Sequence, residues 1–537
     1  RRPPRSTPLY SSAASDVYKR QGKLTFKNSI NISGGELQAG DGTLEFSDGG
    51  SVAKLTLDNT TLVLKDDLTV GEIFKTTGTQ PTLQFNNNNL DLTSVNVQMH
   101  LGTSLDLNNI TTSEKTALLL SADSTLTRSS AFTLGSINLQ NKALSLGSAE
   151  SDLTVTGSVT FTGGPNSQIN TGGADLSLQS ELSLSFGKLS STAGTLAFEQ
   201  GAALGNDAVL DFSASKIKLS GLLDISGGTL TSSSTSNLEL QSASSLSSSA
   251  QFTIPSLDLN GRKLSLNSAT THLVISSPFT AGTNESVDTK GGSLTLNGTA
   301  TFENKAAIES SSGTLTFNGN VSLDDSSILL TGGSALFSSA TQISGGELKL
   351  HDAALTLNSG ITMKDSSKLS LKNTNFAGSS KVTLTGGTLD LGGTIGSLSS
   401  VQTDANTSLE LNSDTTITRT DAMEAGGLNL KTFSLTLGSD TTDLTINSPL
   451  ELNSAASKLI TQDADLVLQD SLQLNAGEIT STAGTFTFTK GGTLGSSGIL
   501  DVSGTTLKLS DNLSAENGTL TSNPSDSVSY THLTLPT

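Results

Sequence analysis

The strongest constraint in this sequence is a short triplet of apolar, polar and apolar side chains that recurs along most of the chain, about seven residues apart. Examples are LTF (24–26), LEF (44–46), LDL (90–92), LSL (144–146), LSL (176–178) and LAF (196–198). Because alternate residues of a strand point to opposite faces, each triplet predicts a short strand with one buried face. Clusters such as GG, NG and DG lie between the triplets and favour tight corners. The stretch nearest to a helical pattern, TSEKTALLLS (112–121), is predicted to be a strand plus a turn.

A second, longer repeat becomes visible when the sequence is compared with itself. SINLQNKALSLGSA (136–149) returns as SLDLNGRKLSLNSA (256–269) and as GLNLKTFSLTLGSD (427–440), and 191–220 returns as 481–510. Apolar positions keep their class between copies, whereas the polar positions between them exchange, which specifies the register of each strand. With three strands in a coil, one coil takes about 20–21 residues, and the copies then lie near-integer numbers of coils apart.

An all-β fold, a single parallel β-helix, accounts for both repeats. Each coil would stack on the previous one at the strand spacing of about 4.8 Å, with inward Leu, Ile, Val and Phe forming columns. We predict that residues 22–526 form one continuous β-solenoid of roughly 24 coils with three strands per coil. Such a core grows linearly with length, which suits 537 residues of which only 34% are hydrophobic and 4% aromatic.

The two ends differ from the repeat region in composition. Residues 1–21 and 527–537 hold all three Tyr and four of the seven Arg. Both segments resemble translated adapters of a transposon-based sequencing library, which implies that the chain is a metagenomic fragment with two non-native ends. We therefore exclude both segments from the fold prediction and expect them to add no coil, because they lack the apolar alternation of the repeats.

Composition excludes several classes of function. The chain has no Cys, which removes disulfides, thiol catalysis and Cys-based metal sites. Its formal net charge of -19 argues against nucleic acid and anionic lipid as partners, because both require basic patches. No apolar run approaches the roughly 20 residues of a membrane-spanning helix, so the chain is not expected to span a membrane itself.

Residues that carry catalytic or metal chemistry are few and scattered. His100, His272 and His351 lack the spacing of metal ligands, so we predict solvated positions on turns or strand faces. Arg128 and Arg419 occupy matching copies, TLTRSSA and TITRTDA. This match predicts a repeated structural role, such as pairing with a neighbouring carboxylate, rather than a single substrate clamp.

Two pairs of adjacent carboxylates, Asp66–Asp67 and Asp324–Asp325, are the best catalytic candidates in the sequence. Successive residues of a strand point to opposite faces, however, so we interpret both pairs as solvated turn acids. The asparagine run of FNNNNLDL (85–92) is interpreted as a polar corner rather than as the start of an asparagine ladder. We therefore predict no catalytic, cofactor-binding or metal-binding residue.

Several segments share a GG-x-L-x-L unit with a Ser/Thr/Asn-rich outer face: GGELQAGDGTLEF (34–46), GGSLTLNGTATF (291–302), GGELKL (345–350) and GGTLDL (386–391). They resemble the passenger regions of bacterial autotransporters and related large surface adhesins. The resemblance implies an extracellular or outer-cell-surface location, a structural or adhesive role and no cofactor. The partner it implies is a host-cell or surface glycan or protein receptor, or other copies of the chain.

Three classes of function are compatible with a β-helix. A secreted or cell-surface structural and adhesive rod, which is not an enzyme, requires only length, regularity and a polar face, and we predict this class. The alternative is a carbohydrate-active β-helix enzyme, a polysaccharide lyase or hydrolase, which requires long loops and clustered acids with Arg or Lys; the corners here are about two to five residues long. An ice-binding solenoid would repeat T-x-T on every coil, but TFTFT (485–489) becomes TLAFE (195–199) in the other copy.

Overall fold

A computed structural model describes residues 22–515, 517–523, 528–530 and 533–534 of the chain. Nearly all of its regular structure is β-strand, and the one helix in these ranges is a single 3-10 turn, η1 (Leu398–Ser400). The strands form parallel sheets that stack as a β-solenoid of about 25 turns, which confirms the predicted fold class. The described residues contain no helix that is long and apolar enough to cross a membrane.

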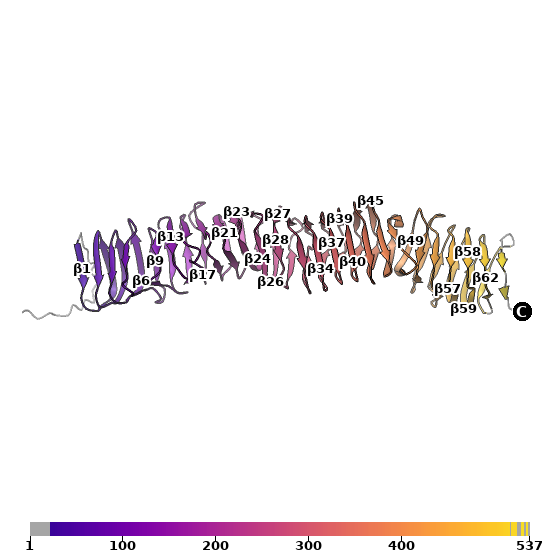
Figure 1. Cartoon of the computed structure of the whole chain (residues 1–537), viewed down its shortest axis with the longest axis horizontal. Coiled ribbons are helices and arrows are strands. Elements are labelled where there is room, and N and C mark those ends of the chain that lie inside the picture. The colour runs from indigo at the N-terminus through magenta and orange to yellow at the C-terminus, as the bar shows by residue number, and fades with distance from the viewer. Residues whose placement is uncertain (1–21, 516, 524–527, 531–532, 535–537) are drawn as a thin grey trace, which may run out of the picture. The chain divides into compact units, whose positions relative to one another are not determined.

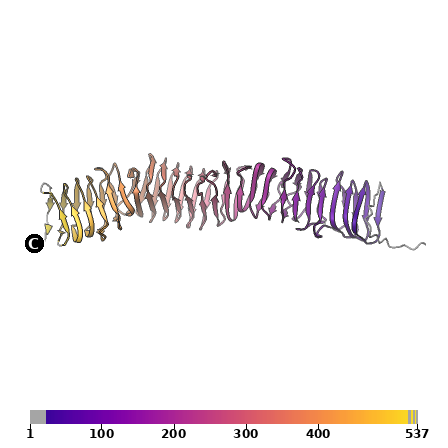
Figure 2. The same cartoon turned by 180° about the vertical axis from the view of Figure 1, so that it is seen from behind.

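The chain divides into two compact units, the first ending at Leu257 and the second beginning at Asp258. Within each unit, successive strands lie side by side like the rungs of a ladder, as Figures 1 and 2 show from opposite sides.

The first unit contains two sheets of its own, part of a third, and β27 as the first strand of a fourth. The four-stranded sheet consists of β1 (Gly22–Phe26), β3 (Gly42–Phe46), β5 (Thr61–Leu64) and β7 (Thr82–Gln84). The nine-stranded sheet consists of β2 (Ile30–Gly40), β4 (Gly50–Asp58), β6 (Leu68–Thr77), β8 (Leu90–Asp91), β9 (Gln98–Leu101), β11 (Ile110–Thr111), β12 (Ala117–Leu120), β15 (Ser136–Asn138) and β18 (Val159–Thr160). The remaining strands up to the boundary are β10 (Leu105–Asp106), β13 (Ser124–Thr127), β14 (Phe132–Leu134), β16 (Ala143–Leu146), β17 (Leu153–Val155), β19 (Gln168–Asn170), β20 (Leu176–Leu178), β21 (Leu182–Ser190), β22 (Thr195–Phe198), β23 (Ala202–Asp211), β24 (Lys216–Asp224), β25 (Thr229–Thr231), β26 (Asn237–Ser247), β27 (Gln251–Ile254) and β28 (Ser256–Asp258).

The second unit has four sets of strands. One set follows a single sheet: β29 (Lys263–Leu266), β32 (Ser286–Asp288), β35 (Ala307–Ser310), β38 (Ser327–Leu330), β41 (Glu347–His351), β44 (Lys368–Lys372), β47 (Thr388–Thr394), β49 (Ser408–Ile417), β51 (Gly427–Asn429), β52 (Ser434–Leu437), β54 (Leu450–Leu452), β55 (Lys458–Ile460), β57 (Leu472–Thr480), β59 (Gly492–Asp501), β61 (Leu513–Ser514), β62 (Thr519–Thr521) and β64 (Leu533–Thr534). A second set is β30 (His272–Ile275), β33 (Ser293–Leu296), β36 (Thr314–Phe317), β39 (Ser334–Phe337), β42 (Ala354–Leu357) and β45 (Asn375–Gly378). A third is β31 (Phe279–Ala281), β34 (Ala300–Glu303), β37 (Val321–Asp324), β40 (Thr341–Ser344), β43 (Ile361–Lys364), β46 (Val382–Thr385) and β48 (Val401–Gln402). The fourth is β50 (Met423–Ala425), β53 (Leu444–Ile446), β56 (Leu466–Leu468), β58 (Thr485–Phe488), β60 (Thr506–Leu509) and β63 (Val528–Tyr530).

The core consists of apolar columns that run from turn to turn, as the triplets predict. One column in the second unit joins directly opposed, fully buried residues of six successive strands: Ile308, Ile328, Leu348, Leu369, Leu389 and Leu409. Neighbours in this column are 20 or 21 residues apart, which confirms the predicted coil length in this region. The first unit is less regular, because the spacing between opposed residues varies. Thr43 lies opposite Thr61, 18 residues later, whereas Phe74 lies opposite Met99, 25 residues later. Some corners are also longer than predicted, such as 161–167 between β18 and β19.

The long sequence repeat corresponds to matching turns in the two units. β21 pairs with β23, and β57 pairs with β59, with a register shift at the same place in each pair. Gly187 and Gly477 stand just after the shift with φ of 89° and 93°, and a Cβ at either position would come within 2.5 Å of a backbone oxygen of the preceding turn. Both the backbone conformation and the close approach therefore require glycine at this corner.

Segment 527–537 differs in part from the prediction. Val528–Tyr530 pairs in parallel with β60, and Leu533 lies opposite Leu513 of β61. The expectation that this segment adds no coil is thus wrong for these residues, because VSY and LTL each repeat the apolar–polar–apolar triplet. The adapter origin of both ends stays a prediction, and residues 1–21 lie outside the described residues.

Candidate functional site

The paired acids lie on corners, where turn residues were predicted. Asp66 and Asp67 are exposed between β5 and β6, and the Asp67 carboxylate accepts the Asn89 N–H at 2.8 Å. Asp324 and Asp325 are exposed at the end of β37, and Asp325 has a left-handed φ of 46°. Each pair thus stands where the chain turns, and the two pairs belong to different units.

Two other local predictions agree with the structure. In the asparagine run, Asn86 and Asn87 have left-handed φ values of 48° and 69°, and the Asn86 amide donates to the Leu64 carbonyl at 3.0 Å. This geometry is that of a polar corner. In the segment 112–121, a turn is followed by β12, as predicted.

The three histidines lie on strands as half-buried outer-face residues. Nε2 of His100 lies 3.0 Å from Oε1 of Gln98, and Nε2 of His272 lies 2.9 Å from Oγ1 of Thr295. His351, on β41, contacts Ser370 on the next turn at 3.0 Å. Across the described ranges, no three His, Asp or Glu side chains are grouped so that they could hold a metal ion.

Arg128 and Arg419 make matching contacts, which supports the predicted repeated structural role. Nη1 of Arg128 donates to the Ile110 carbonyl at 3.4 Å, and Nη1 of Arg419 donates to the corresponding Val401 carbonyl at 2.7 Å. In both copies a hydroxyl from the following turn accepts the backbone N–H of the arginine at 2.9 Å. The guanidinium group therefore joins two turns in each copy.

The two arginines differ in burial and in carboxylate pairing. Arg419 is only 3% exposed, whereas Arg128 is half-buried. Nη2 of Arg419 lies 3.1 Å from the Asp421 carboxylate, while Nε of Arg128 donates to the Ser130 hydroxyl at 3.2 Å. The predicted carboxylate partner is thus present in one copy, and serine stands at the corresponding position in the other.

One polar cluster of the second unit was missed by sequence reasoning. It lies on the outer face of β41, β44, β47 and β49 around Asp390, which is only 6% exposed. The Asp390 carboxylate contacts Lys368 Nζ at 3.0 Å and accepts hydrogen bonds from the Ser370 hydroxyl at 3.1 Å and the Asn412 amide at 3.0 Å. His351 contacts the same hydroxyl. We call these five residues the Asp390 cluster.

The geometry of the Asp390 cluster favours cohesion between turns over catalysis. In a nucleophilic triad, histidine lies between the hydroxyl and the carboxylate and accepts the hydroxyl proton. Here Ser370 is in the middle, and its hydroxyl donates to the Asp390 carboxylate. Only 2% of the Ser370 residue is exposed. Burial lowers the pKa of His351, and the nearby Lys349 and Lys372 lower it further, which favours the neutral ring. Burial lowers the pKa of Lys368, but the hydrogen bond to Asp390 and the negative charges of Asp390, Glu347 and Glu410 together outweigh it, so the pKa is raised and the ammonium stays charged.

An ion-pair cluster of the first unit also joins neighbouring turns through charged side chains. The Glu45 side chain on β3 is 7% exposed and lies between Lys23 Nζ at 2.5 Å, on the preceding strand β1, and Lys65 Nζ at 3.0 Å, directly after the following strand β5. The hydrogen bonds from Lys23 and then Lys65 lower the pKa of Glu45 from 4.5 to about 2, against the opposing effect of burial. Glu45 therefore stays ionised while it joins three turns.

We expect Glu45→Gln to remove part of the pH dependence of stability. Because the folded-state pKa lies below the ordinary value, the stabilisation is complete above pH 4.5 and is lost as the pH falls towards about 2. Urea unfolding of both proteins should show a stability difference that is largest above pH 5 and shrinks below it. Lys27→Met, at an exposed lysine, is the control and should follow the wild-type profile. A stability difference that is the same at every pH would contradict this assignment.

Two surface grooves lie where strands one turn apart belong to different sheets. The first, of about 540 Å³, lies in the second unit between β48 and β50 and is lined by Thr383, Leu384, Thr385, Gln402, Thr403, Asp404, Arg419, Asp421, Ala422, Met423, Glu424 and Thr445. Its acids are engaged: Asp404 accepts three hydrogen bonds, Asp421 pairs with Arg419, and Glu424 accepts from Asn447. Burial would raise the pKa of Asp404, but the hydrogen bond from the Gly386 N–H and those from Thr407 and Asn406 hold it below its ordinary value. These acids therefore fix corners of the chain.

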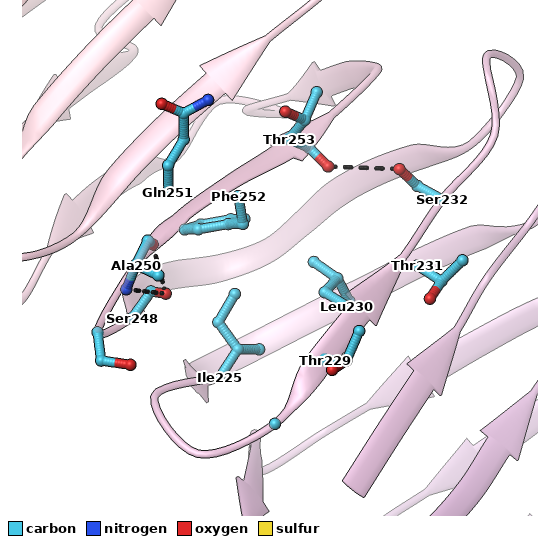
Figure 3. Close-up of a pocket in the computed structure, with 12 residues that line it drawn as sticks. Ile225, Thr229, Leu230, Thr231, Ser232, Ser248, Ala250, Gln251, Phe252 and Thr253 are labelled. Carbon is cyan, nitrogen blue, oxygen red and sulfur yellow. Dashed lines mark hydrogen bonds between the residues drawn. The ribbon is translucent and has the colours of Figure 1, made fainter. Parts of the chain in front are cut away.

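The second groove, of about 440 Å³, lies in the first unit between β25 and β27 (Figure 3). We call it the Phe252 groove. Its lining is entirely uncharged: Ile225, Gly228, Thr229, Leu230, Thr231, Ser232, Ser248, Ser249, Ala250, Gln251, Phe252 and Thr253. Sequence reasoning missed it, because TLT at 229–231 resembles every other triplet.

Comparison with known proteins identifies no relative of this chain. No protein-family model matches the chain, and no curated protein and no solved structure is significantly similar to it.

Proposed function

We propose that this chain is a structural and adhesive protein of a cell surface or the extracellular medium, and that it is not an enzyme. The observation that carries the proposal is the use of its reactive side chains. The carboxylates of Glu45 and Asp390, the guanidinium group of Arg419 and the His351 ring each bond to a neighbouring turn. Such groups hold a repetitive scaffold together, and their occupied hydrogen-bonding positions favour cohesion over proton transfer.

The outer surface supports the same proposal. On the β31–β48 sheet, one outward position of each strand is an uncharged hydroxyl or amide: Thr280, Thr301, Ser322, Gln342, Thr362, Thr383 and Gln402. These residues stand directly opposite one another from turn to turn. A regular array of this kind offers many equivalent weak contacts, which suits adhesion through multivalency.

The test is an adhesion assay with the full chain. Beads coated with the chain should attach to epithelial cells, to mucin-coated surfaces or to other coated beads more often than albumin-coated beads do. If the coated beads attach to none of the three surfaces, an adhesive role is refuted.

The alternative, a carbohydrate-active enzyme, has one favourable observation, which is the convergence of His351, Lys368 and Asp390 on one outer face. We expect no release of reducing ends or of unsaturated products from pectin, alginate, xylan or glucan. Release of either product that is abolished by Asp390→Asn would establish the enzyme and overturn the non-catalytic proposal.

A further inference from the structure

The Phe252 groove exposes residues that elsewhere would be covered by the next turn. Leu230 of β25 lies directly opposite the fully buried Leu210 of β23 and so continues an inward column. β27 belongs to a different sheet from β25 and does not pair with it. Leu230 and Phe252, at inward positions of these two strands, are consequently only half-buried. Figure 3 shows both side chains beside Ile225, and these three residues form an apolar floor.

A polar rim surrounds this floor. Thr229 and Thr231 flank Leu230 on β25, and Gln251 and Thr253 flank Phe252 on β27, and all four are exposed. Their hydroxyl and amide groups make no hydrogen bond to another residue in the described ranges. The Ser232 hydroxyl crosses between the two strands and donates to the Thr253 carbonyl at 3.3 Å, which fixes the width of the groove at one end. The rim thus offers donors and acceptors that are available to a ligand.

We propose that the Phe252 groove binds a neutral saccharide. A pyranose ring has an apolar face of C–H groups and a periphery of hydroxyls, and these match the Phe252 and Leu230 floor and the threonine and glutamine rim. The absence of charge among the lining residues disfavours uronates, sulfated glycans and charged peptides, since a charged group would lose water without gaining a counter-charge. A volume of about 440 Å³ lies within the usual range of small-ligand sites, roughly 300–1,000 Å³. This inference rests on the proposed adhesive function and names the chemistry of one contact.

The experiment is affinity electrophoresis of the full chain in native gels that contain dextran, galactomannan, xyloglucan, polygalacturonate or heparin. We expect at least one neutral polysaccharide to retard the chain and neither acidic polysaccharide to do so. Because no ionic contact is involved, the dissociation constant should change less than twofold between low and high salt.

Phe252→Ala should weaken this binding at least tenfold by removing the ring from the floor. Phe376→Ala is the matched control, because Phe376 is also a half-buried phenylalanine on an end strand of a sheet, β45, and should leave binding unchanged. Thr231→Glu places a charge on the exposed rim without touching the core and should weaken binding several-fold. It keeps the test decisive if Phe252→Ala lowers stability.

Several outcomes would overturn the inference. These are retardation by none of the neutral polysaccharides, retardation by the acidic ones alone, or wild-type binding by both Phe252→Ala and Thr231→Glu. Self-association that is lost in Phe252→Ala would assign the groove to a second copy of the chain instead. The two proposals fail separately: gels that show no retardation refute the saccharide groove and leave adhesion intact, whereas beads that attach to none of the surfaces refute adhesion without changing the result of the gels.

Discussion

Replacing Leu369 with aspartate is expected to lower the free energy of unfolding of the second unit by at least about 4 kcal/mol. Leu369 is fully buried and stands directly opposite Leu348 and Leu389 in an apolar column. A carboxylate in this column would stand between the apolar side chains of Leu348 and Leu389, which offer it neither a counter-charge nor a hydrogen bond. Hydrogen exchange of β41, β44 and β47 measures the effect, because only the turns around the substitution should lose protection.

Two controls separate burial of charge from the addition of charge. Thr362→Asp places the same carboxylate on the exposed outer face of β43, and Asp324→Asn removes a corner acid. Both should change stability by less than about 0.5 kcal/mol. If Leu369→Asp is not produced in soluble form, Leu369→Ala should still cost about 2–5 kcal/mol. Equal effects of Leu369→Asp and Thr362→Asp would contradict the assignment of Leu369 to the core.

The columns could be predicted from sequence because their signal is local. The period of two within a triplet already separates Leu315 and Phe317 from Thr314 and Thr316, and the structure buries the first two while the others point outward. The long repeat also predicts that Arg128 and Arg419 occupy equivalent positions, and their contacts in the structure match. Both inferences require only the order of residues within a strand or between whole copies.

The Asp390 cluster and the Phe252 groove could not be predicted in the same way. The cluster depends on which outer-face residues of successive turns stand opposite each other, and one extra residue in a corner changes every such neighbour. Ser370 lies opposite Asp390 only because β44 and β47 pair in this register. The groove depends on β27, the strand one turn beyond Leu230, belonging to another sheet, and the triplet itself carries no sign of this.

The second large effect is expected at Arg419. Its guanidinium group donates to the carbonyls of Leu398 at 3.0 Å and Val401 at 2.7 Å, on the preceding turn. With only 3% of the residue exposed, Arg419→Ala removes a buried donor from both oxygens; the Leu398 carbonyl keeps the Val401 N–H as a donor, whereas the Val401 carbonyl loses its guanidinium partner. Hydrogen bonds from a charged group contribute about 1.5–3 kcal/mol, and an orphaned buried acceptor adds a desolvation cost. We therefore expect a loss of about 3 kcal/mol or more in urea unfolding.

The sequence supplies a matched control for this prediction. Arg128→Ala removes the equivalent side chain of the first unit, but Arg128 is half-buried and its bond to the Ile110 carbonyl is longer, at 3.4 Å. Water can replace it, so the expected loss is about 1 kcal/mol. Arg419→Lys should recover little stability, because an ammonium group lacks the planar fork that reaches both carbonyls and the Asp421 carboxylate together. If Arg128→Ala were as damaging as Arg419→Ala, or if lysine restored full stability, the positive charge rather than the forked contact would hold these turns together.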